Sequence, residues 1–206
     1  MVTLKVKMTF DEEVLGTASG NPDLHKEYIA SKAPDAQSME EEVAAIGTEG
    51  VFEKAMTVFP RNEEGNPIVF NYQLKGLFKD AFSFLKKIPG TETSKIKAYK
   101  KEVDGLIFVQ PRQIPIDIKD GGKIGECSRP LRAQTAQGER VALATSETIP
   151  AGSSITFEIK MLTDVHEKAI IEALKYGKDR GFGQWRNSGK GVYHFEILDR
   201  KQEPYS

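Results

Sequence analysis

The sequence predicts an α+β fold in which two helices pack on a sheet. Residues 2–10 alternate between apolar and polar side chains, as do residues 155–161 and 193–198, and this two-residue period is typical of half-buried strands. Residues 74–88 instead repeat apolar side chains at three- and four-residue spacing, and residues 164–178 do the same, as amphipathic helices do. Both periods in one chain indicate a mixed sheet-and-helix protein.

Length and charge limit the possible classes of protein. The chain has 206 residues, of which 39% are hydrophobic and 29% are charged, an ordinary composition for a globular protein with a sizeable core. We expect a single domain over residues 1–206, with an insertion at about 11–60. The formal net charge of −1 argues against nucleic-acid binding driven by bulk charge, although it leaves room for a local basic groove.

Cysteine content and hydropathy bear on the compartment. The chain has one cysteine, Cys127, so it can form no intramolecular disulfide and no cysteine-rich metal site. We therefore expect a reducing compartment and no bound metal or other cofactor. The sequence begins directly with a strand pattern, and no apolar run approaches the ~20 residues that cross a bilayer. These features predict a soluble cytoplasmic protein without a membrane partner.

Residues 11–53 have a weaker periodicity and form most of the predicted insertion. Glycine and proline interrupt the pattern, several glutamates make the segment acidic, and one helix is expected at about 38–46. Asp23 and His25 lie in this segment, two residues apart. Such a pair suits acid–base or metal chemistry, but a pair on a surface loop has the same pattern. The sequence therefore assigns no catalytic or metal-binding residue here.

The strongest helical pattern covers residues 74–88. Its apolar stripe predicts a buried face, and its lysines, which include Lys75 and Lys79, lie off that stripe. A proline-glycine pair ends the pattern. More lysines follow, and then the continuous apolar run at residues 106–109, which suits a central strand.

Polar hydrogen-bond donors dominate residues 129–140. Arg129, Arg132 and Arg140 occur here with glutamine and threonine, just before the strand-like residues 141–144. Such donors suit a sugar-phosphate backbone better than an apolar small molecule. A polar hairpin without a ligand would have the same composition, so both interpretations stay open.

A glycine-spaced loop at residues 181–191 separates the second predicted helix from the last strand. Its four glycines are Gly181, Gly183, Gly189 and Gly191. Glycine accepts a positive φ and lets another backbone approach closely, so the main chain of the loop is expected to lie against something. The cationic side chains beside it are Arg180, Arg186 and Lys190. Exposed N–H groups next to positive charges predict a place for phosphate.

The spacing of the loop excludes two common nucleotide motifs. A phosphate loop needs serine or threonine after its lysine, but Lys190 is followed by Gly191, and in a dinucleotide-binding fold the glycines open a helix rather than follow one. A connection whose glycines merely let the helix pack on the sheet is the alternative. Trp185, the only tryptophan, is either a platform on which a base stacks or a side chain that fills the core beneath the loop.

Three stretches of the chain, in this order, resemble the RAMP superfamily, the repeat-associated RNA-binding proteins of CRISPR systems. The likeness is greatest to the subunits that form the crRNA-holding backbone of effector complexes. Residues 66–79 are similar to the family's hairpin, short loop and leucine-lysine-glycine helix start. Residues 132–138 and 146–159 look like its arginine-led loop, glutamate, proline-glycine turn and phenylalanine-bearing strand. Residues 181–191 fit its glycine pattern, and the three matches span about residues 57–198.

The resemblance implies a ferredoxin-like, RNA-recognition-type βαββαβ fold with an N-terminal insertion. In that family the glycine-rich loop and the helix start line an RNA path. The matching residues, for which the resemblance implies contacts with the RNA backbone, are Lys75, Lys79, Gly181, Gly183, Gly189 and Gly191. The residue types themselves add, as phosphate or base partners, Arg132, Arg180, Trp185, Arg186 and Lys190.

The function that this resemblance implies is non-enzymatic binding of single-stranded, crRNA-like RNA, with further copies of the chain or CRISPR effector subunits as partners. One alternative is an endoribonuclease, because some relatives cut RNA with a histidine or an N-terminal aspartate. The corresponding region here offers Asp23, His25 and Asp35, and no motif selects among them, so no catalytic residue is carried over. The other alternative is a phage-borne anti-defence protein that imitates a backbone subunit or sequesters a nucleotide.

Overall fold

The first sheet has the strand order of a ferredoxin-like fold. The structure is a computed structural model that describes residues 1–19, 56–135 and 138–204, and within residues 131–143 it describes the backbone. The strands of the first sheet, in spatial order, are β11 (Tyr193–Gln202), β1 (Val2–Phe10), β10 (Ser154–Met161), β7 (Gln113–Asp117) and β5 (Ile68–Phe70), with β6 (Ile107–Gln110) also paired to β10. Its strand pairs are antiparallel. β1 thus lies between β11 and β10. This arrangement confirms the predicted α+β fold and is compatible with the ferredoxin-like topology.

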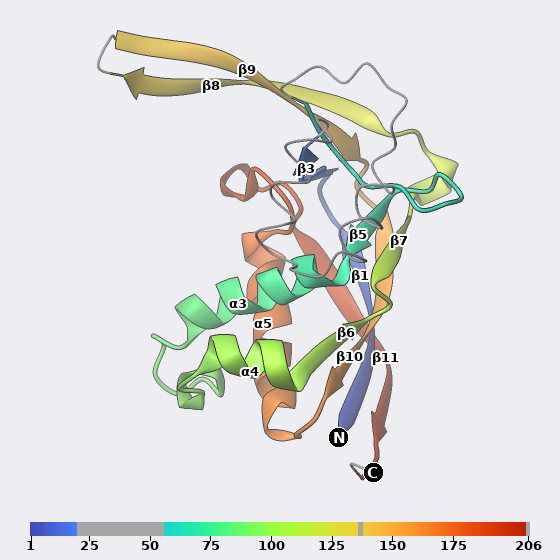
Figure 1. The fold of residues 1–206 in the computed structure, drawn as a ribbon, viewed down its shortest axis with the longest axis vertical. Coiled ribbons are helices and arrows are strands. Elements are labelled where there is room, and N and C mark those ends of the chain that lie inside the picture. Colours follow the sequence, from blue (N-terminus) through green and yellow to red (C-terminus); the bar gives the residue numbers. More distant parts are fainter. Residues whose placement is uncertain (20–55, 136–137, 205–206) are drawn as a thin grey trace, which may run out of the picture.

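Helices cover one face of this sheet (Figure 1). They are α3 (Asn71–Leu85), α4 (Tyr99–Leu106) and α5 (Val165–Arg180). Short 3₁₀ turns occur at Thr93–Lys95, Lys119–Gly121 and Arg186–Ser188. The apolar side chains of β1 point toward the helices and are fully buried, as are Leu74, Phe78 and Phe82 of α3. Each such side chain contributes roughly 1.5–3 kcal/mol of hydrophobic stabilisation, so this layer is the main core.

A second sheet lies beyond the C-terminal end of β1 and the N-terminal end of β10, next to the glycine-rich loop. Its strands are β2 (Val14–Leu15), β3 (Ala18–Ser19), β4 (Met56–Val58), β8 (Gly125–Thr135) and β9 (Gly138–Ile149). β8 and β9 pair along their whole length as an antiparallel hairpin, which extends across the top of Figure 1, beyond the first sheet and the helices. The polar segment at residues 129–140 is therefore part of a long hairpin.

The predicted elements differ from the observed ones mainly at their ends. α3 begins at Asn71, before the predicted start, because the backbone N–H of Phe70 donates to Oε1 of Gln73 at 2.8 Å and so caps the first turn. α5 extends to Arg180 and ends at Gly181, whose φ of 81° no other residue adopts easily. α4 was not predicted, since it is a short helix of 8 residues.

The prediction of a central strand at residues 106–109 is wrong. β6 pairs with β10 along one side, and its side chains alternate between buried and exposed. Phe108 is 37% exposed, and the Nζ atom of Lys75 lies 5.1 Å from the centre of its ring. This cation–π contact with the lysine ammonium group stabilises the part-exposed aromatic ring at this position.

α5 and β11 pack so closely that glycine is needed where they meet. Tyr193 is fully buried, and its hydroxyl donates a hydrogen bond of 3.0 Å to the carbonyl of Leu174. A side chain at Gly177 would collide with this hydroxyl and would lie 2.9 Å from the ring carbon that bears it. Burial raises the pKa of Tyr193, so the phenol stays neutral in the folded protein.

We predict that Gly177→Ala lowers the free energy of unfolding by about 1–3 kcal/mol, because the new methyl group overpacks the contact with Tyr193. The loss should be smaller in a Tyr193→Phe background, where the colliding hydroxyl is absent. Chemical denaturation of the two single variants and the double variant gives the coupling energy. Additive effects would contradict this account of Gly177.

Candidate functional site

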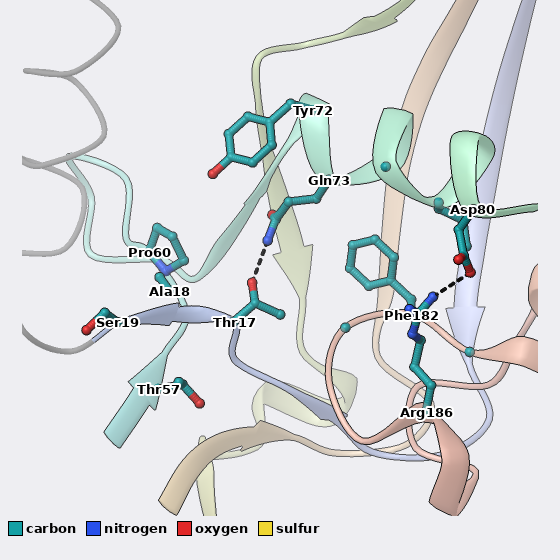
Figure 2. A pocket seen from close by; sticks show the side chains of 14 residues that line it. Thr17, Ala18, Ser19, Thr57, Pro60, Tyr72, Gln73, Asp80, Phe182 and Arg186 are labelled. Atoms are coloured by element: carbon teal, nitrogen blue, oxygen red, sulfur yellow. Dashed lines mark hydrogen bonds and ion pairs between the residues drawn. The ribbon is translucent and has the colours of Figure 1, made fainter. Parts of the chain in front are cut away.

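A cavity of about 630 Å³ opens between the start of α3, the glycine-rich loop and the strands β3 and β4 (Figure 2). Its lining residues are Thr17, Ala18, Ser19, Thr57, Pro60, Tyr72, Gln73, Gly76, Leu77, Asp80, Gly181, Phe182, Gly183 and Arg186. Hydroxyl, amide and main-chain groups predominate among its polar atoms. The chemistry of the lining therefore suits a ligand that forms many neutral hydrogen bonds.

Gln73 connects the start of α3 to the segment that precedes β3. Its Oε1 atom accepts the Phe70 N–H, and its Nε2 atom donates to Oγ1 of Thr17 at 2.6 Å (Figure 2). Asn71 adds a second anchor, because its Nδ2 atom donates to the carbonyl of Val109 at 2.9 Å. These bonds fix the first turn of α3 at one wall of the cavity.

Gly76 lies in the middle of α3, is exposed and lines the cavity. A Cβ atom added at this position would meet no atom within 4 Å. Glycine inside a helix costs about 1 kcal/mol relative to alanine. Packing among the described residues therefore gives no reason for this glycine, whereas close approach of a ligand to the helix backbone would.

The glycine-rich loop closes on itself. The N–H of Phe182 donates to the carbonyl of Gly191 at 2.8 Å, and the N–H of Gly191 donates to the carbonyl of Glu13 at 2.9 Å. Side chains at Gly181 or Gly191 would collide with the opposite side of the loop, at Lys190 and Phe182 respectively. Glycine is therefore required at these two positions by internal packing.

The other two glycines have different surroundings. A Cβ atom at Gly183 would lie 3.0 Å from the carbonyl oxygen of Leu15, whereas one at Gly189 would meet nothing within 4 Å. Gly181 and Gly183 nevertheless line the cavity with their backbone. The alternative interpretation, that the glycines serve packing, thus explains part of the pattern, and backbone contact with RNA remains a prediction.

Asp80 of α3 neutralises the two arginines beside the loop. Its Oδ2 atom lies 2.9 Å from Nη1 of Arg186 (Figure 2). The same atom lies 3.5 Å from Nε of Arg180. Nη1 of Arg180 also donates to Oδ1 of Asn187 at 2.9 Å. Both predicted phosphate partners thus already interact with a carboxylate on the wall of the cavity.

The three predicted lysines are also held by protein groups. Lys79 forms an ion pair of 2.5 Å with Asp104, and Nζ of Lys75 donates to the Asp104 carbonyl at 3.2 Å. Burial lowers the pKa of Lys75. Lys190 forms an ion pair with Glu13. Lys75 and Lys79 lie off the cavity lining, so the structure does not bring all the predicted cations together.

Trp185 does not fill the core beneath the loop. Its side chain is 39% exposed, and the guanidinium carbon of Arg129 lies 4.9 Å from the centre of its ring. Nη2 of Arg129 donates to Oε1 of Gln184 at 3.1 Å, and Nε2 of Gln184 donates to the carbonyl of Gly16 at 3.0 Å. The hairpin β8–β9 therefore contacts the glycine-rich loop through these side chains.

Glu147 of β9 holds the segment that follows β4 in place through two hydrogen bonds. It accepts a hydrogen bond of 2.8 Å from the backbone N–H of Phe59 and one of 2.7 Å from Nη2 of Arg61. It thereby fixes the segment after β4, which carries Pro60 of the cavity wall, while Thr57 of the same wall lies in β4 itself. Sequence reasoning did not find Gln73, Asp80 or Gln184, because each acts on a residue that is distant in the chain.

Several predicted features lie outside the described residues. They are the helix at 38–46, most of the insertion, Asp23, His25, Asp35 and the side chain of Arg132. Across the ranges that are described, no three histidine, cysteine or acidic side chains gather as metal ligands. None of the described helices is long and apolar enough to span a membrane.

Comparison with known proteins gives a likeness of fold. Neither a protein-family model nor a curated protein sequence matches the chain. Among solved structures, a chain in the cryo-EM structure of the type III-B Cmr-beta bound to cognate target RNA is similar, with a TM-score of 0.51 and 13% sequence identity. The likeness covers 97% of this chain and 60% of that chain. At this identity the likeness concerns the fold alone.

The ion pair between Lys190 and Glu13 should make stability depend on pH in the alkaline range. A hydrogen bond to Glu13 raises the pKa of Lys190 above its ordinary value of 10.5. The pair therefore stabilises the fold fully below about pH 10.5 and is lost as the pH rises through the higher pKa of the folded state. We predict that the difference in free energy of unfolding between the wild type and Lys190→Met, of the order of 1 kcal/mol at neutral pH, shrinks at alkaline pH.

Denaturant titrations of both proteins at pH 7 and above pH 10.5 measure this difference. Ionisation of Tyr193 affects the two proteins equally, so it cancels in the comparison. A difference that stays constant across this range would contradict the contribution of the ion pair.

Proposed function

We propose that the chain is a non-enzymatic RNA-binding protein of the RAMP type. The observation that carries this proposal is the meeting of the three family-like stretches at one place. The start of α3 and the glycine-rich loop line the same cavity. The second stretch reaches the cavity wall through Ser146, whose hydroxyl accepts a hydrogen bond of 2.8 Å from Oγ1 of the lining residue Thr57. Stretches that are far apart in the sequence and that resemble one RNA-binding family converge on a single surface.

The cavity suits the backbone of a single strand. Hydroxyl groups, the amide of Gln73 and the main chain of Gly181 and Gly183 offer neutral hydrogen bonds to sugar and phosphate oxygens. Gly76 leaves space for a strand to lie directly against α3. Single-stranded RNA is recognised by such combinations of shape, hydrogen bonding and stacking.

The structural neighbour supports the proposal through its fold. It belongs to a structure of the type III-B Cmr-beta bound to cognate target RNA, and this chain spans 60% of the length of the matching chain. We infer that the ligand of this protein is crRNA-like single-stranded RNA. Further copies of the chain or CRISPR effector subunits are the proposed protein partners.

The deciding experiment is binding of a labelled single-stranded RNA of about 20 nucleotides, followed by fluorescence anisotropy at several salt concentrations. Affinity should fall as salt rises, because phosphate contacts release counterions. Gel analysis of the same samples shows whether the RNA stays intact. Absence of binding at low salt would overturn the proposal. Cleavage would favour an endoribonuclease, and a small nucleotide that co-purifies would favour sequestration.

Gly76→Ala should have opposite effects on the stability of the protein and on its affinity for RNA. Alanine at this position should raise the free energy of unfolding by about 0.5–1 kcal/mol, because it favours the helix. The same methyl group should lower the affinity for RNA several-fold, because it occupies the place of the ligand backbone. Thermal or chemical denaturation and RNA titration measure the two effects.

Gly105→Ala is the matched control. Gly105 is also exposed and helical, and a Cβ atom there would meet nothing within 4 Å, but it lies in α4 away from the cavity. It should stabilise the protein without changing RNA affinity. Equal RNA affinities for the two variants would show that Gly76 does not contact RNA.

Asp80→Asn should strengthen RNA binding. The change removes the carboxylate that neutralises Arg186 and Arg180, so both guanidinium groups become available to phosphate. We expect the affinity for RNA to rise several-fold. The slope of the logarithm of the binding constant against the logarithm of the salt concentration should become steeper by about 0.7 for each additional phosphate that is neutralised. Anisotropy titrations at four or more salt concentrations give both quantities.

Glu167→Gln controls for the added positive charge. It releases Arg200, which pairs with Glu167 at 2.6 Å on α5 and β11, and it changes the net charge equally. This variant should bind RNA as the wild type does. The same increase in affinity in both variants would mean that overall charge, rather than the cavity, determines binding.

A further inference from the structure

Arg129 of β8 is a buried cation that lacks an anionic partner in the part of the chain that the structure describes. The residue is 8% exposed, and its Nε and Nη1 atoms are buried without a hydrogen-bond partner among the described residues. Its Nη2 atom donates to the neutral amide oxygen of Gln184. In this respect Arg129 differs from Arg180, Arg186 and Lys190, each of which is paired with a carboxylate.

Such an arrangement is costly in the unliganded protein. An arginine side chain stays protonated at any physiological pH, so it cannot avoid the cost of burial by losing its charge. Buried charges in folded proteins are normally paired, and an unpaired one destabilises the fold. The indole of Trp185 offers partial compensation through its negative face, but it accepts no conventional hydrogen bond. An anion supplied by a ligand would satisfy the free donors.

Trp185 covers this cation from a strained backbone conformation. Its φ of 54° and ψ of 33° lie in the left-handed region, which a bulky residue rarely adopts. Strain of this kind is held in place by surrounding structure and is common at ligand-binding sites. The covering ring is itself 39% exposed, so one part faces Arg129 while another faces solvent.

We propose that Arg129 and Trp185 form a subsite for one nucleotide of single-stranded RNA. The indole ring moves off the guanidinium group, and Arg129 donates a hydrogen bond from Nε or Nη1 to a phosphodiester oxygen. The freed ring then stacks on the adjacent base. This subsite rests on the proposed RNA-binding function and extends it beyond the cavity. Gln184 holds Arg129 to the carbonyl of Gly16, next to Thr17 of the cavity wall, so the two regions are continuous.

Arg129→Met tests the phosphate contact. The variant should bind single-stranded RNA at least tenfold more weakly, and the logarithmic salt slope should be smaller by about 0.7, the value for one phosphate contact on a single strand. The melting temperature should rise by about 2–4 °C, because an unpaired buried charge is replaced by an apolar side chain of similar length. A residue with a purely structural role would lower the melting temperature and leave the salt slope unchanged.

Trp185→Leu tests the stacking contact. It should weaken RNA binding about tenfold while the salt slope stays that of the wild type, because stacking releases no phosphate counterions. The tryptophan fluorescence of the wild-type protein also reports on this contact without any substitution. Since Trp185 is the only tryptophan, saturating RNA should quench the emission of this one indole.

The outcomes separate the subsite from the general function. One outcome would overturn the subsite and leave the RNA-binding function intact. In that outcome the wild type binds RNA without a change in tryptophan emission, and both variants keep the affinity and salt slope of the wild type. Failure of the wild type to bind RNA at low salt would overturn both. The phosphate contact of Arg129 and the stacking of Trp185 would be established by three results. Both variants bind RNA more weakly, only Arg129→Met has a smaller salt slope, and RNA quenches the tryptophan emission of the wild type.

Discussion

The closure of the glycine-rich loop is the constraint on which the site depends. The hydrogen bond from the Phe182 N–H to the Gly191 carbonyl draws the two ends of the loop together, and buried Phe182 stacks on Phe10 of the core with ring centres 6.1 Å apart. The residues between these ends, which include Trp185 and Arg186, are thereby held between α3 and the hairpin β8–β9. A rigid base of this kind lets exposed residues keep a defined geometry.

Electrostatic pairing gives the candidate site its particular character. Asp80 and Glu13 neutralise the cations that border the loop, in a chain whose formal net charge is −1. A polyanion that binds here must exchange these carboxylates for its own phosphates, so each phosphate contact stabilises the complex less than one to a free lysine or arginine would. Discrimination would then come from fit to the cavity more than from charge, as is common for RNA recognition.

Periodicity was sufficient to predict the sheet and the two long helices, because the alternation in residues 2–10 and the apolar stripes of α3 and α5 reflect burial directly. Glycine content also located the loop. It did not reveal which glycines serve packing, since Gly191 and Gly189 look alike in sequence and differ only in their neighbours. The pairing of Arg186 with Asp80 joins elements far apart in the chain and has no local signal.

The position of β1 affects how the protein can be synthesised and folded. This strand pairs with β10 on one side and with β11, the last strand, on the other, so its partners are made long after it. Such non-local pairing forms slowly, and an apolar strand that has not yet paired is prone to aggregation. A nascent chain that stalls before β11 would expose an edge of β1, and we therefore expect co-translational chaperone binding to matter more for this fold than for a helical protein of equal length.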